Sequence, residues 1–79
     1  MHLLVIKDNF SGNSVLKNGQ LVIEVIDPKF LPEVTKSMKV PDLAIVSKEL
    51  NTEDQRRALS FAYELTEYKE GNLSKVVML

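Results

Sequence analysis

The chain has 79 residues, of which 44% are hydrophobic and 27% charged, a balance typical of one globular domain spanning residues 1–79. Ten Lys and Arg against eleven Asp and Glu give a net charge of -1, which argues against a strongly basic nucleic-acid or membrane-surface protein. With no cysteine and a single histidine, the sequence excludes a disulfide framework, a thiolate nucleophile and a cysteine-based or histidine-rich zinc site.

The first part of the chain predicts three strands. Residues 3–6 are consecutively apolar and followed by polar residues, which is typical of a short strand buried on both faces. A polar loop is expected at residues 8–14. Beyond it, Asn18-Gly19 separates two further strand-like runs, and this dipeptide favours the type I′ turn of a β-hairpin. The paired strands are expected at residues 15–17 and 20–26.

The middle of the chain predicts a helical turn, a short helix and another strand. Asp27 is a good helix N-cap and Pro28 suits the first helical position, so the hairpin should end there. Because Pro32 would break a helix begun at Pro28, we expect one irregular turn and then a short helix over about residues 32–38. Residues 43–46 form the next apolar run of strand character.

A long helix is predicted over residues 52–70. Thr52 and Gln55 have the spacing of a capping box, and Gly71 is typical of a residue that ends a helix. Between them, apolar residues recur at helical spacing and predict one buried stripe, formed by Ala58, Phe61, Ala62, Leu65 and Tyr68. Residues 73–79 then predict a last strand.

These elements predict an α+β domain in the order β-β-β-α-β-α-β, with a mixed sheet of four or five strands, an N-terminal hairpin and the long helix on one face. The strand at residues 43–46, the long helix and the last strand should form a βαβ unit. Since one helix cannot cover both faces of a sheet, the second face must be covered by the short helix and loop, or by another protein chain.

The sequence contains no recognisable catalytic or metal-binding set. Ser47 and Lys48 are adjacent, so at a strand end they point to opposite faces and the lysine cannot activate the hydroxyl. His2 has no acidic residue near it in the sequence, and we expect it to be solvated. The acidic clusters lack the histidine or loop glycine of known metal-site patterns. We expect no enzymatic activity, no metal and no cofactor.

By elimination, we expect a small non-enzymatic regulatory or inhibitory protein that acts by protein–protein contact, of the type that phage and plasmid genes encode. The absence of cysteine and of a recognisable export signal favours the cytoplasm. Phe10 either contacts the partner or folds back onto the core as a lid. The candidate partner-binding residues are Phe10, Asn13, Lys29, Lys36, Lys39 and Arg56.

Two further hypotheses concern partners. A nucleic-acid binder would use Lys29, Lys36 and Lys39, which cluster around the predicted short helix, although solvated surface explains this small excess of charge more simply. A homodimer is expected because the apolar end of the chain needs cover, and an edge strand could pair with its symmetry mate. Its contact residues would be Val76, Val77, Met78 and Leu79. The alternative is a monomer in which the short helix and the Phe10 loop cover the second face.

Overall fold

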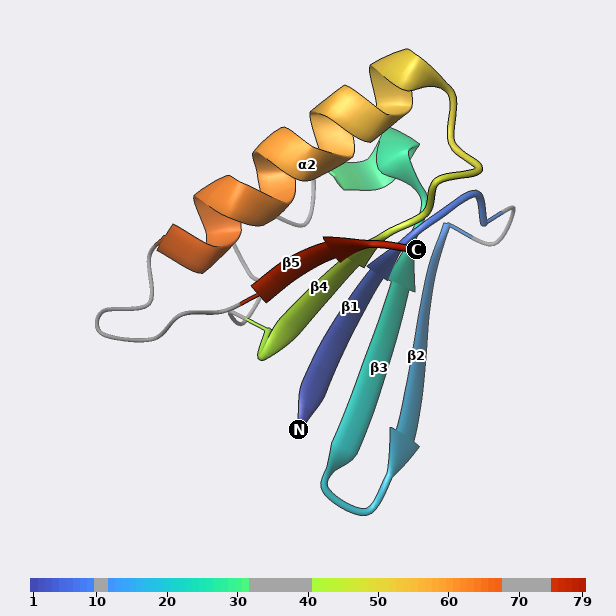
Figure 1. Ribbon diagram of the computed structural model, residues 1–79. Coiled ribbons are helices and arrows are strands. Elements are labelled where there is room, and N and C mark those ends of the chain that lie inside the picture. Colours follow the sequence, from blue (N-terminus) through green and yellow to red (C-terminus); the bar gives the residue numbers. More distant parts are fainter. Residues whose placement is uncertain (10–11, 32–40, 68–74) are drawn as a thin grey trace.

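The computed structural model describes residues 1–9, 12–31, 41–67 and 75–79, and it has the predicted α+β architecture (Figure 1). Its strands form a single five-stranded mixed sheet, and one long helix packs on that sheet. The elements in chain order are β1 (His2–Ile6), β2 (Asn13–Asn18), β3 (Leu21–Ile26), the 3-10 turn η1 (Pro28–Phe30), β4 (Leu43–Val46), α2 (Thr52–Glu67) and β5 (Lys75–Met78). The predicted short helix at residues 32–38 lies outside the described residues.

The strand order across the sheet is β2-β3-β1-β4-β5. The central strand β1 pairs in parallel with β3 on one side and with β4 on the other. The predicted βαβ unit is confirmed, because β4 and β5 are parallel neighbours joined through α2. β2 pairs antiparallel with β3 and forms one edge of the sheet. The sheet is therefore mostly parallel, with one antiparallel hairpin.

The hairpin is confirmed, but its turn lies one residue later than predicted. Asn18 pairs with Leu21, so the two loop residues are Gly19 and Gln20. Gly19 has φ 62, and no described residue other than glycine has a positive φ. A type I′ turn needs positive φ at both central residues, whereas type II′ needs it only at the first. The turn therefore follows the type II′ pattern, with the glycine at its first central position.

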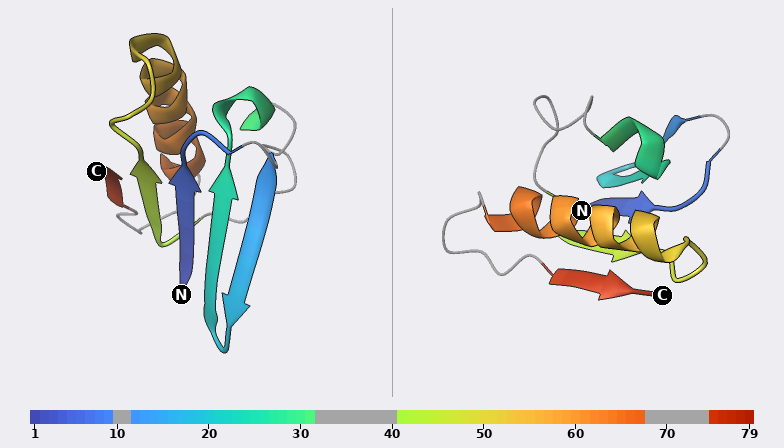
Figure 2. Two further views of the ribbon diagram at one scale, coloured as in Figure 1. Left: turned by 90° about the vertical axis from the view of Figure 1, so that its right-hand side faces the viewer. Right: turned by 90° about the horizontal axis from the view of Figure 1, so that it is seen from above.

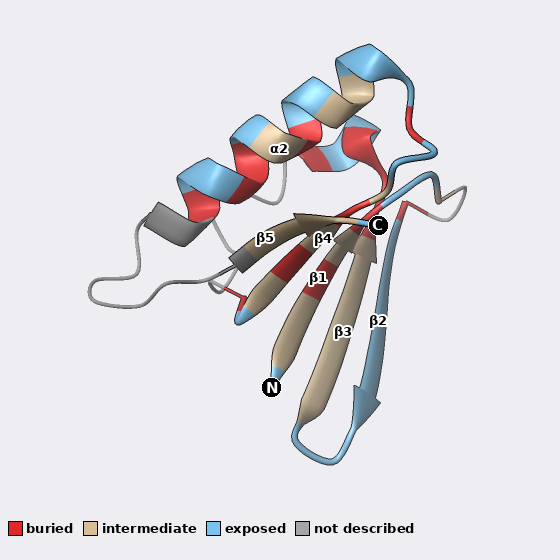
Figure 3. Ribbon diagram, viewed as in Figure 1, coloured by how far each residue is buried: buried red, intermediate tan, exposed pale blue. Residues whose placement is uncertain are grey.

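The core lies between the sheet and α2, where Ala44, Ala58 and Ala62 are fully buried (Figure 3). These small residues leave room for the helix to approach the strands closely. The predicted apolar stripe of α2 is confirmed over its described part, and Tyr68 lies outside the described residues. The buried hydrophobic core consists of Leu4, Ile6, Ile26, Leu31, Ala44, Val46, Leu50, Ala58, Phe61, Ala62 and Leu65.

The long helix begins with a different cap from the one predicted. The backbone N–H of Asp54 donates to Asn51 Oδ1 at 2.8 Å, and the Asn51 side-chain amide donates to Asp54 Oδ2 at 3.1 Å. Asn51 is therefore the N-cap instead of Thr52, and Asp54 bonds back to the Asn51 side chain, whereas the third residue of a capping box bonds back to the backbone N–H of the cap. The Gln55 side chain instead donates to the carbonyl of Leu50 at 2.7 Å. Asparagine caps a helix at least as well as threonine, which explains the shift by one residue.

The prediction that residues 3–6 are buried on both faces is wrong. Leu4 and Ile6 are fully buried, whereas Leu3 and Val5 are only partly buried. Successive side chains of a strand point to opposite faces, so each pair belongs to its own face. The views in Figure 2 show α2 and η1 on the same side of the sheet. One face of β1 is therefore covered by helical elements, and the described residues place no helix on the other.

Candidate functional site

The face of the sheet that points away from α2 carries two rows of aliphatic side chains, which we call the open sheet face. The register places Leu16, Ile23, Leu3 and Leu43 in one row across β2, β3, β1 and β4. It places Val25, Val5, Ile45 and Val77 in a second row across β3, β1, β4 and β5. Apart from Leu16, which is 64% exposed, these side chains are partly buried.

The open sheet face is uncharged over its three central strands. On β1, β3 and β4 every residue that points to this side is Leu, Val or Ile, because His2 and Glu24 fall on the α2 side. Most of the side chains are β-branched and have little rotamer freedom, so they present a stiff surface. A contiguous aliphatic surface of this kind on a small protein is typical of a contact site for another macromolecule.

Polar groups gather at the end of the sheet where β1 and β3 finish. Asp27 is buried, and its carboxylate accepts hydrogen bonds from the backbone N–H groups of Asn9 and Lys29, both at 2.9 Å. These two bonds, the Asn9 bond first, hold the pKa of Asp27 below its ordinary value. The bond to Lys29 caps η1 as predicted, with Pro28 in its first turn. Both carboxylate oxygens serve the backbone, so we assign Asp27 a structural role.

Gly12, at the end of the loop between β1 and β2, packs against η1. The backbone N–H of Asp27 donates to the Gly12 carbonyl at 3.0 Å, which draws the loop towards the end of β3. A Cβ built on Gly12 would lie 3.1 Å from the nearest atom of the Phe30 ring, and Gly12 has φ +83. A side chain at residue 12 is therefore disfavoured both by the ring and by the backbone conformation. Gly12 and η1 therefore pack together on the α2 side (Figure 2).

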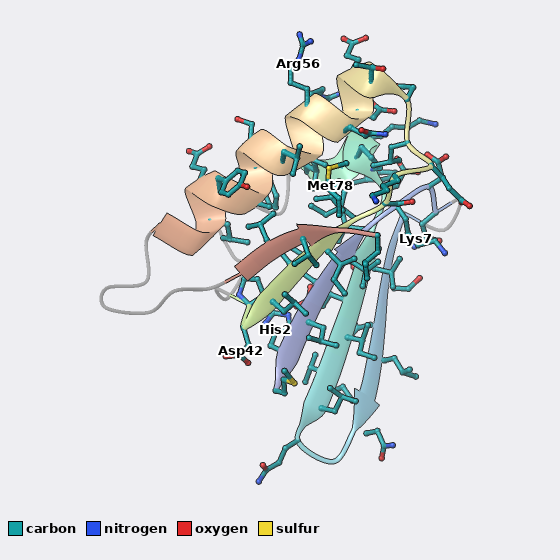
Figure 4. All side chains as sticks on the ribbon, in the orientation of Figure 1. His2, Lys7, Asp42, Arg56 and Met78 are labelled. Atoms are coloured by element: carbon teal, nitrogen blue, oxygen red, sulfur yellow. The ribbon has the colours of Figure 1, made fainter. Side chains whose placement is uncertain are left out.

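The prediction that His2 is solvated is wrong. Its side chain is 16% exposed, and His2 Nε2 lies 2.7 Å from Glu24 Oε1 of β3. The separation is that of an ion pair, although the approach lacks the alignment of a hydrogen bond. His2 also bonds to Asp42 through the backbone N–H, which donates to Asp42 Oδ2 at 2.8 Å (Figure 4). The contact between His2 and Glu24 could not be predicted from the sequence, because the two residues are far apart in the chain. Only the parallel register places Glu24 beside β1.

The predicted partner-binding residues do not gather in one place over the described chain. Asn13 is exposed on the edge strand β2, and Lys29 is exposed on η1 near the same end of the sheet. Arg56 points away from the sheet on the outer side of α2 (Figure 4). Phe10, Lys36 and Lys39 lie outside the described residues.

The predicted dimer contacts lie on β5 and just after it. β5 pairs with β4 and forms the second edge of the sheet. Val76 and Met78 pack partly against the core on the α2 side, whereas Val77 belongs to the open sheet face. Leu79 is 73% exposed. The predicted residues are therefore divided between the two faces of the edge strand and the chain end.

Among the residues that the structure describes, no group of three or more His, Cys, Asp or Glu side chains could hold a metal ion. The described helices include none with the length and apolarity needed to cross a membrane. The chain matches no family model, no curated protein and no solved structure. The functional interpretation therefore rests on the open sheet face.

Proposed function

We propose that this chain is a non-enzymatic regulatory or inhibitory protein that acts by protein–protein contact through its open sheet face. The observation that carries the proposal is the pair of aliphatic rows that no described helix covers. Aliphatic groups cannot take part in acid–base, nucleophilic or metal chemistry, but they do gain free energy when another protein removes them from water. The proposal assigns the protein to the cytoplasm, since it contains no cysteine that an oxidising compartment would pair.

A comparison of three baits tests this proposal. The wild-type chain, Ile45→Lys on the open sheet face and Tyr63→Lys on α2 would each be immobilised and exposed to the same lysate. Tyr63 is 54% exposed on the helix, so a lysine there leaves the open sheet face intact. We expect a protein that the wild type and Tyr63→Lys retain and that Ile45→Lys loses, because a lysine in an aliphatic contact remains unpaired.

The retained protein would then be purified and its affinity for the same three chains measured by calorimetry. We expect Ile45→Lys to weaken binding at least tenfold and Tyr63→Lys to leave it within a factor of two. Equal retention by all three baits, or equal affinity of the purified protein for all three chains, would contradict the assignment of function to this face.

A further inference from the structure

We infer that the protein seated on the open sheet face is a second copy of this chain, packed face to face to form a sandwich of two sheets. The inference rests on the proposed function, because it identifies the partner of the same surface. Two properties of the described residues lead to it: the uncharged character of the face over its three central strands and the central position of β1.

The lack of charge on the face favours a second copy over an unrelated protein. Surfaces that select a different partner usually carry charged or polar groups, which steer association and reject wrong partners. The face presents only Leu, Val and Ile on β1, β3 and β4. The register places Lys75 beside Leu43 at the edge strand β5, so the charge-free area is that of the three central strands. That area fits another flat aliphatic surface, and the same face of a second copy supplies one through a two-fold axis. Homodimer interfaces are accordingly more apolar than those between different proteins.

The packing geometry is the ordinary one for two sheets. Two faces of aliphatic side chains pack with their backbones ~10 Å apart and their strands about 30° from parallel. β1 is the central strand, so a two-fold axis through the middle of the interface places β1 opposite β1 of the second copy. Val5 of β1 therefore lies near its own counterpart. Ser14 and Asn18, the polar residues of β2 that the register places on this side of the sheet, form the hydrated rim of the interface or lie beside it.

Pairing through the edge strand β5 gives a different geometry. In that arrangement the two sheets join into one, and the β1 strands lie five inter-strand spacings apart, or ~24 Å. Edge pairing also leaves both aliphatic rows in water. Val5 thus distinguishes the two dimers, since it is close to its counterpart only when the faces pack together.

The absence of cysteine makes cross-linking at single positions a direct test. Val5→Cys would be compared with a control variant, Ser60→Cys, in the full-length chain. Ser60 is exposed on α2. Both variants would be treated with a short bismaleimide at low micromolar concentration, and circular dichroism would verify that each is folded. We expect most of Val5→Cys to become a covalent dimer and Ser60→Cys to remain below a tenth of that yield. Leu43→Cys, in the neighbouring row, repeats the test if Val5→Cys does not fold.

Each outcome decides between the two proposals. A high yield at Val5 that a second substitution, Ile45→Lys, abolishes supports the face-to-face dimer. Equal yields at Val5 and Ser60, or no cross-linking at Val5 and Leu43, overturn it. If cross-linking fails while Ile45→Lys still loses a protein that Tyr63→Lys retains, the partner is a different protein and the proposed function stands. If cross-linking fails and the wild type, Ile45→Lys and Tyr63→Lys retain the same proteins from the lysate, both the dimer and the proposed function are wrong.

Discussion

The two faces of the sheet are made of similar residues but differ in what covers them. On the α2 side, Leu4, Ile6 and Val46 are fully buried beneath the helix. On the open side, Leu3, Val5 and Ile45 alternate with them along the same strands and are only partly buried. A strand's hydrophobicity therefore does not determine its burial, because the cover comes from elements elsewhere in the chain or from another chain. The open face is the side of the sheet that no described helix covers (Figure 2).

The largest effect should come from placing a charge beneath the helix. Leu65 is 5% exposed in the core, so Leu65→Asp buries an unpaired carboxylate at a penalty of several kcal/mol. Small domains have roughly 5–15 kcal/mol of stability, and we expect this variant to be largely unfolded at 25 °C by circular dichroism. Tyr63→Asp on the exposed side of α2 is the matched control and should melt close to the wild type. A wild-type melting curve for Leu65→Asp would show that the α2 side is not the core.

A sharper comparison uses two neighbouring leucines of β1 that point to opposite faces. Leu4→Ala should lower the free energy of unfolding by about 2–5 kcal/mol at every protein concentration, because it leaves a cavity in the core. Leu3→Ala should have a smaller effect on the isolated protomer. Its effect on the melting temperature should grow with protein concentration, because the lost contacts belong to the dimer. If the loss of stability is independent of protein concentration for both Leu4→Ala and Leu3→Ala, the open sheet face does not contact a second copy through Leu3.

Acidification should act on the α2 side alone. The backbone hydrogen bonds of Asp27 lower its pKa, so the charged carboxylate stabilises the folded state. This stabilisation is complete above the ordinary aspartate pKa and is lost as the pH falls through the lowered pKa. Asp27→Asn should destabilise the fold by about 1 kcal/mol at pH 7. The difference from the wild type should shrink on acidification, as measured by urea unfolding between neutral pH and pH 2. A constant difference across that range would refute the role of the charge.

The smallest effect is expected at the margin of the open sheet face. Leu16 of β2 is 64% exposed, so Leu16→Gln should change the stability of the protomer by less than about 0.5 kcal/mol. The dimer should weaken by a factor of a few, much less than with Ile45→Lys, because residues at a rim contribute less than central ones. Sedimentation velocity on Leu16→Gln and Ile45→Lys measures which substitution weakens the dimer more. Equal weakening by both would show that Leu16 is central to the contact.

Most of the fold could be predicted from local sequence patterns. The apolar run at 43–46, the stripe of α2 and the glycine of the hairpin are signals within a few residues, and local physics determines them. Two of the misassigned details differ from the observed positions by one residue. The hairpin turn begins at Gly19, and Asn51 rather than Thr52 caps α2. Such shifts arise because several neighbouring residues can serve as a cap or occupy a turn.

The candidate site was harder to predict because it depends on tertiary register. The sequence indicated that the long helix would cover only one face of the sheet, but it did not identify which residues would form the other face. Only the pairing of β1 with both β3 and β4 aligns Leu3 with Ile23 and Leu43 in one row. The same pairing brings Glu24 beside His2, a contact between residues far apart in the chain. Contacts between distant segments leave no short motif in the sequence.

The mass of the protein in solution tests the central claim most directly. Sedimentation equilibrium of the wild-type chain at low micromolar concentration should give twice the 8.9 kDa of a single chain, and Ile45→Lys should give a single-chain mass while remaining folded. A wild-type mass of 8.9 kDa throughout the micromolar range would contradict the packing of the open sheet face against a second copy.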